Sequence, residues 1–144
     1  MRSDGLNSGV TRQDGMTLVY SRPKEGHVHG VGFLLGREAS KALAGYWTIS
    51  ERFLIIKLKA RRFDIMLIQI YAPTTLATEE ELDKFYEMLD EAISQCNSQE
   101  MIFVFGDANS KVGQGRVADI VGPHGLGVRN ENGKRLVKWC KRNG

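Results

Sequence analysis

The sequence has few cysteines and few prolines, and it has no long apolar run. Its 144 residues include three prolines and two cysteines, Cys96 and Cys140. Two cysteines so far apart predict the reduced packing thiols of an intracellular protein, not a disulfide framework. No apolar stretch approaches the roughly 20 residues that a membrane-spanning helix needs, and the polar first ten residues do not resemble a secretory signal. These absences argue against a disulfide-stabilised secreted domain, and we expect no membrane partner.

Charge of one sign is not in large excess either. Twenty Lys and Arg residues stand against 17 Asp and Glu residues, which gives a formal net charge of +3. Such mild basicity allows a polyanionic partner without requiring one. Residues 1–15 are rich in Gly, Ser, Asn and Asp and have no hydrophobic period, so we expect a loose N-terminal segment there. The remaining residues, 16–144, are enough for one domain with a core.

Short apolar segments bounded by glycine or proline predict strands in the first third of the chain. The predicted strands cover residues 16–21, 30–36 and 46–50, with a short helical or irregular piece over 38–45. The next segment, 53–61, alternates at period two, which predicts a strand with one buried face. Its other face carries a basic row: Lys57, Lys59 and Arg61. We expect this row to be a solvated outer face, and a track for nucleic-acid phosphates is the alternative.

The middle of the chain has the pattern of a β-α-β unit. Residues 63–71 contain a continuous apolar run, which suits a strand that is covered on both faces. Thr78 and Glu81 have the spacing of a capping box, and an apolar stripe then continues to Cys96, which predicts an amphipathic helix. Residues 101–106 have the composition of another strand.

The last part of the chain has the pattern of a long loop followed by a helix. Residues 107–130 are glycine-rich and irregular, and a loop of this length in a compact domain often has a function. Asn130 is a suitable cap for a helix over 131–142. We expect three residues on the buried side of that helix: Leu136, Val137 and Cys140. The order of all these elements predicts an α/β fold with a mixed sheet.

The β-α-β unit predicts a candidate site. Its two strands should run parallel, because a helix of this length returns the chain to the side where it started. Tyr71 and Asp107 would then lie at one edge of the sheet, where the ligands of open α/β sheets gather. Asn109, two residues further on in extended backbone, would point the same way as Asp107.

A phenol, a carboxylate and an amide suit phosphodiester hydrolysis. A carboxylate can take a proton from the attacking water, and an amide can orient that water. A phenol can donate a hydrogen bond to a phosphoryl oxygen, where negative charge develops. The alternative is that Gly-Asp-x-Asn is only a turn and that Tyr71 is only the aromatic end of a strand.

Two motifs at this separation resemble those of a known superfamily. They are Ile70-Tyr71-Ala72-Pro73-Thr74 and Phe105-Gly106-Asp107-Ala108-Asn109. With three further stretches they make the chain similar to the endonuclease/exonuclease/phosphatase superfamily, and in particular to the endonuclease domains of non-LTR retrotransposon polyproteins. The further stretches are His29–Phe33, Ser50–Arg52 and Asn130–Gly133. The likeness covers the chain from Asp14 onward.

This resemblance implies a fold, a cofactor and residue roles. The chain would be part of a four-layer α/β sandwich with mixed sheets, incomplete at both ends, that hydrolyses DNA phosphodiesters with Mg²⁺ and works in the nucleus. Tyr71 would contact the scissile phosphate, Asp107 would be the general base, and Asn109 would position water or phosphate. We further expect Lys111 and Arg52 to bind the substrate.

The sequence also departs from the pattern of this superfamily. Its members carry an Asn and a metal-binding Glu before the region aligned with Met16, and a closing Ser-Asp-His segment, and none of these is identifiable here. Ala108 stands where an aromatic residue is usual. We therefore expect impaired activity. The alternatives are a non-catalytic remnant that binds nucleic acid or serves as an interaction module, and a phosphatase of the same superfamily.

The three histidines do not predict a zinc site. The spacing of His27, His29 and His124 fits no zinc pattern, and no pair of cysteines accompanies them. We expect these histidines at the surface or at the start of a strand.

Overall fold

The computed structural model of the chain describes residues 6–26 and 29–144. Among these residues the fold is mixed α/β, with two sheets and three helices, as the order of sequence patterns predicts. The chain divides into two compact units. The first consists of the described residues of Met1–Tyr71 together with Glu91–Gly106, and the second consists of Ala72–Asp90 together with Asp107–Gly144.

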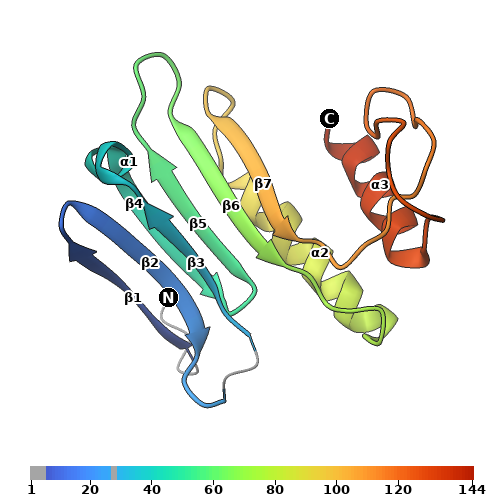
Figure 1. Ribbon diagram of the computed structural model, residues 1–144, viewed down its shortest axis with the longest axis horizontal. Coiled ribbons are helices and arrows are strands. Elements are labelled where there is room, and N and C mark those ends of the chain that lie inside the picture. The colour runs from blue at the N-terminus through green and yellow to red at the C-terminus, as the bar shows by residue number, and fades with distance from the viewer. Residues whose placement is uncertain (1–5, 27–28) are drawn as a thin grey trace. The chain divides into compact units, whose positions relative to one another are not determined.

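The first unit begins with a three-stranded antiparallel sheet (Figure 1). Its strands, in spatial order, are β1 (Leu6–Gln13), β2 (Met16–Pro23) and β3 (Val31–Leu35). The expectation of a loose segment over residues 1–15 is wrong for β1, while residues 1–5 lie outside the described part. The two-residue turn Asp14-Gly15, with φ of 53° and 79°, joins β1 to β2 and suits a tight hairpin. As an edge strand with mostly exposed side chains, β1 has no hydrophobic period to detect.

The second sheet of the first unit has four strands in the order β4-β5-β6-β7. They are β4 (Leu43–Ser50), β5 (Phe53–Leu58), β6 (Ile65–Tyr71) and β7 (Met101–Asp107), and the helix α1 (Arg37–Ala42) precedes β4. Adjacent strands from β4 to β6 pair antiparallel. These elements match the predicted strands, with ends that differ by a few residues.

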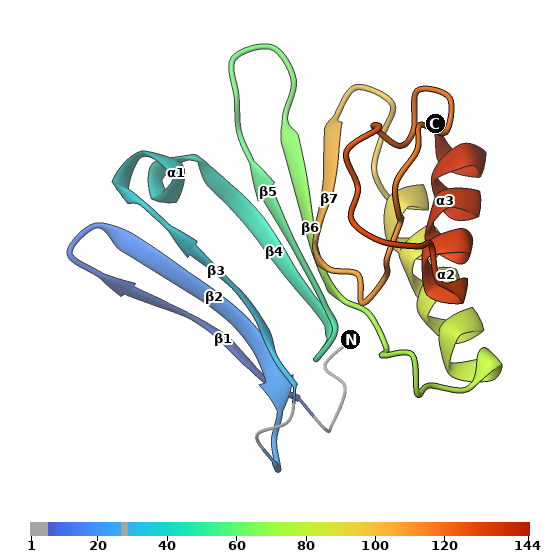
Figure 2. The ribbon, with the colours of Figure 1, turned by 45° about the vertical axis from the view of Figure 1, so that its right-hand side comes forward.

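The core of the first unit lies between its two sheets (Figure 2). It contains Val19, Val31, Phe33 and Leu35 from the first sheet and Leu54 and Ile56 from the second. The predicted half-exposed alternation of β5 is wrong, because Phe53 and Ile55 on its other face are also at most 4% exposed. β5 is therefore covered on both faces. In β6 the burial alternates instead: Met66, Ile68 and Ile70 are buried and the residues between them are half-buried.

β6 and β7 run parallel, as predicted from the length of the helix that links them. At one end, the N–H of Met101 donates to the carbonyl of Asp64 at 2.9 Å. At the other end, Gly106 lies against Ile70 so closely that a Cβ on Gly106 would come within 2.0 Å of the Ile70 carbonyl oxygen. Gly106 also has φ of 133°, so only glycine fits here. The two strands therefore end at the same edge of the sheet.

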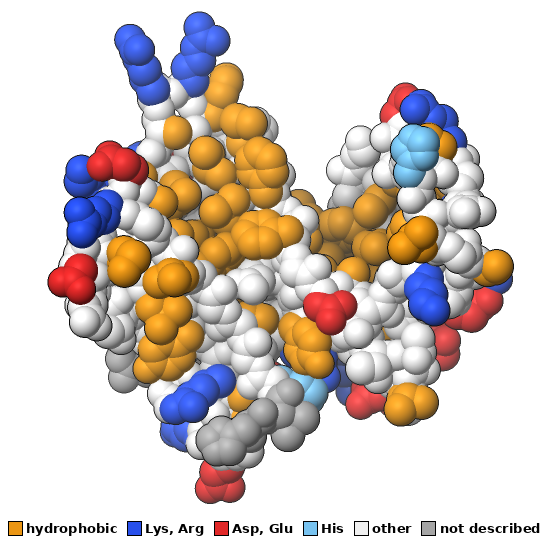
Figure 3. Space-filling model, in the orientation of Figure 1, with side chains coloured by type: hydrophobic (Ala, Val, Ile, Leu, Met, Phe, Trp, Pro, Cys, Tyr) orange, Lys and Arg blue, Asp and Glu red, His pale blue; other side chains and the backbone are white. Residues whose placement is uncertain are grey.

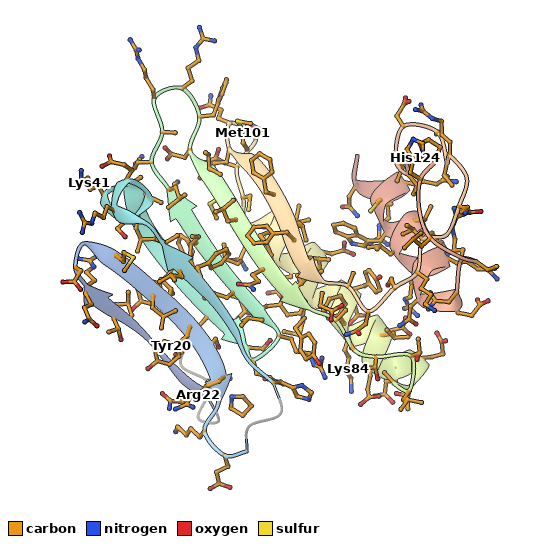
Figure 4. The ribbon with its side chains drawn as sticks, in the orientation of Figure 1. Tyr20, Arg22, Lys41, Lys84, Met101 and His124 are labelled. Carbon is orange, nitrogen blue, oxygen red and sulfur yellow. The ribbon has the colours of Figure 1, made fainter. Side chains whose placement is uncertain are left out.

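β7 is the edge strand of this sheet, and its apolar side chains are exposed. Met101 (labelled in Figure 4), Phe103 and Phe105 are 43–47% exposed, and Figure 3 shows apolar side chains gathered on this part of the sheet. Phe105 contacts Phe33 of β3 edge-to-face, with 5.4 Å between ring centroids. The strand prediction over 101–106 is confirmed, although its composition gives no sign of this exposure.

The second unit contains most of α2 (Glu79–Ser94) and all of α3 (Glu131–Asn143). The predicted capping box is confirmed: Thr78 N–H donates to Glu81 Oε2 at 2.7 Å, and Glu81 N–H donates to Thr78 Oγ1 at 3.2 Å. The side chain of Asn130 caps α3 by accepting from the N–H of Gly133 at 2.8 Å. On α3 Val137 is buried as expected, whereas Leu136 and Cys140 are only half-buried.

No helix in the described part of the chain is long and apolar enough to cross a bilayer.

Candidate functional site

The end of β6 holds Tyr71 and Arg52 together in the first unit. Arg52 follows β4 in the tight turn to β5, where its N–H donates to the side chain of Ser50 at 3.1 Å. Tyr71 N–H donates to the carbonyl of Arg52 at 2.9 Å, and Arg52 Nη1 donates to the carbonyl of Tyr71 at 3.0 Å. The guanidinium carbon then lies 5.3 Å from the centre of the Tyr71 ring, within the range of a cation–π contact. Two of the predicted site residues are therefore neighbours.

His29 is a third member of this cluster, and sequence reasoning did not include it. Its ring centroid is 5.4 Å from that of Tyr71, at an interplanar angle of 47°. Its Nδ1 is buried and has no hydrogen-bond partner among the described residues. A signal was available, because His29 begins the segment His29–Phe33, one of the stretches that carry the family resemblance. His29 lies just before β3, as expected for a histidine at the start of a strand.

The loop after β7 places Asp107 and Asn109 in the second unit. Asp107 Oδ1 accepts the N–H of Asn109 at 2.8 Å, and Asn109 Nδ2 donates to the carbonyl of Ala72 at 2.7 Å. Ala72 N–H in turn donates to the carbonyl of Asp107 at 2.8 Å. Asn109 has φ of 44°, so the expectation of extended backbone between these two residues is wrong: the segment turns in the left-handed region, which Asn tolerates well.

This geometry has features of both interpretations that the sequence left open, a hydrolytic site and a simple turn. The Asp107 carboxylate and the Asn109 amide stabilise a turn, as the second interpretation predicts. Nevertheless, Asp107 is exposed, and its second carboxylate oxygen has no partner among residues 6–26 and 29–144. That oxygen remains available to accept a proton or to bind a ligand.

The backbone of Lys111 is fixed to the beginning of α3. Its N–H donates to Asn130 Oδ1 at 3.1 Å, and its carbonyl accepts the N–H of Asn130 at 3.2 Å. A Cβ on Gly133 would lie 1.8 Å from the Lys111 carbonyl oxygen, so the contact requires glycine at that position. Lys111 itself is exposed and can reach a ligand.

Asn132, like His29, belongs to the candidate site and was missed by sequence reasoning. It is 7% exposed, and its side-chain amide donates to the carbonyl of Asn109 at 3.1 Å. A buried side chain that bonds the backbone of a candidate residue fixes the position of that residue. Asn132 belongs to the segment Asn130–Gly133, which is another of the stretches that carry the resemblance.

The predicted site residues therefore form two groups. Arg52 and Tyr71 come together in the first unit, and Asp107, Asn109 and Lys111 come together in the second. The meeting of the Tyr71 phenol with the Asp107 carboxylate joins the two units and stays a prediction.

The basic row that begins in β5 is solvated at Lys59 and Arg61, as expected, but Lys57 is half-buried. Lys57 Nζ lies 2.5 Å from Glu100 Oε1 and 3.3 Å from Asp64 Oδ2, and Lys59 Nζ lies 2.9 Å from the same Asp64 oxygen. The hydrogen bond from Lys57 lowers the pKa of Glu100, and the hydrogen bond from Lys59 lowers the pKa of Asp64. Hydrogen bonding to Glu100 raises the pKa of Lys57. Since these lysines are paired within the chain, β5 is a poor track for phosphates.

The described residues do not form a metal site by themselves. No group of three or more His, Cys, Asp or Glu side chains within residues 6–26 and 29–144 could hold a metal ion. Of the three histidines, His29 lies in the first unit and His124 in the loop before α3 of the second (Figure 4), and His27 lies outside the described residues. A single carboxylate, that of Asp107, does not make a magnesium site without further ligands.

Comparison with known proteins identifies a homologue. Craniofacial development protein 2 of Bos taurus is 30% identical over 135 residues, which are 94% of this chain and 23% of that protein. The protein of the same name from Tragulus javanicus is 30% identical over 135 residues, 24% of its length. The chain is homologous to craniofacial development protein 2. It spans about a quarter of the length of these relatives, and no family model and no solved structure matches it.

Proposed function

We propose that the chain takes part in phosphodiester hydrolysis on DNA, as a segment of an endonuclease/exonuclease/phosphatase-type domain. The observation that carries this proposal is the locked pair of Arg52 and Tyr71 at the end of β6. It places a permanent cation over a phenol whose motif, Tyr-Ala-Pro, resembles the phosphate-binding motif of that superfamily. A guanidinium and a phenol suit a phosphate, because both donate hydrogen bonds to its oxygens.

The residues take the following roles in this proposal. The Tyr71 hydroxyl donates to a non-bridging phosphoryl oxygen and stabilises the charge that develops there. Arg52 holds Tyr71 and adds positive charge on the same side. The free oxygen of Asp107 takes the proton of the attacking water, while Asn109 and Asn132 keep the Asp107 loop in shape. Lys111 binds a phosphate of the substrate.

Magnesium enters this proposal only as the cofactor that the resemblance implies. A bound Mg²⁺ would neutralise phosphate charge and stabilise the leaving oxygen. Among the described residues, we propose the Asp107 carboxylate as a ligand of Mg²⁺. Removal of Mg²⁺ with a chelator should abolish cleavage.

The test is cleavage of supercoiled plasmid and of an abasic duplex by the whole chain, with and without Mg²⁺. Asp107→Asn keeps an oxygen that accepts the Asn109 N–H but removes the base, so we expect cleavage to fall by about 10² or more. Asp119→Asn is the matched control, because Asp119 is an exposed aspartate of the same loop, and it should cleave as the wild type does. Equal cleavage by both variants would remove Asp107 from the mechanism.

A second candidate function is a non-catalytic nucleic-acid-binding module. The use of Asp107 and Asn109 in a turn, and the lack of a metal-holding group among the described residues, favour it. A wild-type chain that binds DNA but does not cleave it with Mg²⁺ would support this second candidate. A phosphatase of the same superfamily would instead release phosphate from a monoester and leave plasmid intact.

A further inference from the structure

A groove of about 730 Å³ lies between α2 and α3 in the second unit, and neither Asp107, Asn109 nor Lys111 lines it. Its volume is in the range of small-molecule sites. Both helices line it. The lining residues that matter here are Tyr86 from α2, and Lys138, Trp139 and Lys141 from α3.

Five cations of α3 face the same side of the helix. They are Lys134, Arg135, Lys138, Lys141 and Arg142, and all of them line the groove. At 3.6 residues per turn they fall within an arc of about 120°, whose centre is about 100° from the buried Val137. The helix therefore presents a concentrated positive stripe to the groove.

Three of these cations are paired with carboxylates inside the unit. Arg135 bonds to Glu79, at 2.9 Å, and to Asp83. Arg142 pairs with Asp90 of α2, and Lys134 pairs with Glu131, at 2.6 Å. Arg135 also lies over the ring of Tyr86, with 5.4 Å between the guanidinium carbon and the ring centre. Arg135 and Arg142 join α3 to α2, whereas Lys134 pairs within α3, and the charge of all three is largely compensated.

Lys138 and Lys141 differ from these three cations because their charge is not compensated. No carboxylate of the described chain pairs with either lysine, and both side chains are exposed. They are three residues apart, so they point to the same side of α3 with a rise of about 4.5 Å between them. This uncompensated charge is free to bind an anion.

An aromatic side chain, that of Trp139, lines the same groove as these two lysines. Trp139 Nε1 donates to Asp90 at 2.6 Å, and the Trp139 ring lies 6.4 Å from the ring of Tyr86. The hydrogen bond fixes the indole, while the residue stays only half-buried. Part of a rigid aromatic surface is therefore available in a groove that the two unpaired cations also line.

We propose that this groove binds single-stranded nucleic acid, with backbone phosphates on Lys138 and Lys141 and a base on the exposed part of Trp139. The combination of cations with an aromatic platform is what such strands require, because every base has a face that can stack. An acidic peptide would use the lysines but not the indole. An anionic membrane would need a mainly apolar surface, whereas most of the residues that line the groove are charged. Binding here does not depend on hydrolysis at Tyr71 and Asp107.

Trp139 supplies the readout. The sequence has two tryptophans, so Trp47→Phe leaves Trp139 as the sole indole reporter. We expect oligo(dT) of about 12 nucleotides to quench its fluorescence at low salt. In anisotropy titrations with the same labelled oligonucleotide, the double variant Lys138→Gln/Lys141→Gln should bind about tenfold more weakly. Loss of two phosphate contacts should also reduce the slope of log K against log salt by about 1.4.

The control is Arg61→Gln/Arg62→Gln, which removes the same charge from the exposed hairpin between β5 and β6 of the first unit. It should weaken binding by less than about twofold. Equal losses of affinity in the two double variants would mean that the oligonucleotide is attracted to net charge in general. That result would overturn the proposal that the groove is the binding site. Unquenched Trp139 fluorescence would also overturn it, as would equal binding of poly-glutamate or of anionic vesicles. If Trp47→Phe disturbs folding, Trp139→Phe in the wild-type chain, followed by anisotropy, tests the same stacking contact.

Discussion

β5 and α3 both carry rows of basic residues, and the structure uses the two rows in opposite ways. In β5 the Lys57 side chain is 24% exposed, and it meets a Glu100 side chain that is only 7% exposed. On α3 the pair of Lys134 and Glu131 is 60% and 84% exposed. Ion pairs removed from water are costly to break, whereas exposed pairs contribute little. Lys57 is thus part of the structure of the first unit, whereas Lys138 and Lys141 of the second unit are accessible.

The sequence patterns do not reveal this contrast. The alternating row of β5 was the more conspicuous pattern, because it stands in a strand with a regular period. The carboxylates that neutralise it, Asp64 and Glu100, come from other parts of the chain and are not visible in that pattern. The α3 cations look like helix-end residues that complement the dipole, and only the fold places them along a groove.

The largest expected effect comes from the core beneath the β5 row. Ile56 is fully buried between the two sheets, so Ile56→Ala should lower the free energy of unfolding by about 2–5 kcal/mol. Lys59→Ala, just after the end of β5, removes a side chain that is 69% exposed and should change stability by less than about 0.5 kcal/mol. Urea unfolding followed by circular dichroism measures both. Similar losses in the two variants would mean that β5 is not a core strand.

The next effect concerns Glu100, and it depends on pH. Its folded pKa is lowered below the ordinary value of 4.5 by the hydrogen bond from Lys57, so the pair stabilises the fold above that value. The contribution is lost as the pH falls below 4.5 toward the folded pKa. Glu100→Gln should therefore lower Tm at pH 7 and flatten the fall of Tm between pH 5 and more acidic solutions, since it leaves Lys57 with Asp64 alone.

Thermal melts of the wild-type chain and of Glu100→Gln across this pH range test the prediction. A wild-type chain and Glu100→Gln with parallel Tm profiles would show that the ion pair does not respond to protonation. Gln99→Ala is a neighbouring control, since Gln99 is exposed and its side chain has no hydrogen bond among the described residues. It should leave the profile unchanged.

Sequence patterns predict the elements of this fold better than their surroundings. The capping box at Thr78, the cap at Asn130 and the parallel course of β6 and β7 follow from local spacing and from the length of α2. Local spacing does not reveal that β1 is held by its partner strand, or that β7 is exposed at a sheet edge. Those properties depend on which elements become neighbours.

In the candidate site too, the sequence predicts the elements but not the contacts between them. Strand order alone predicts that Tyr71 and Asp107 end neighbouring strands, and the strand ends are confirmed. The stacking of Arg52 on Tyr71, the approach of His29 and the support from Asn132 come from residues far away in sequence. The resemblance marked those segments, but not the contacts that they make.

The smallest expected effect is on the exposed pair of α3. Lys134 and Glu131 are three residues apart on the helix surface, and pairs of this kind contribute about 0.2–0.5 kcal/mol. Lys134→Gln should therefore lower the free energy of unfolding by no more than about 0.5 kcal/mol, and 0.5 M salt should remove the difference from the wild type because it screens exposed charges. Urea titrations at low and high salt measure this. A loss that is larger, or that persists in high salt, would mean that Lys134 stabilises the groove. The contrast between the structural Lys57 and the accessible cations of α3 would then fail.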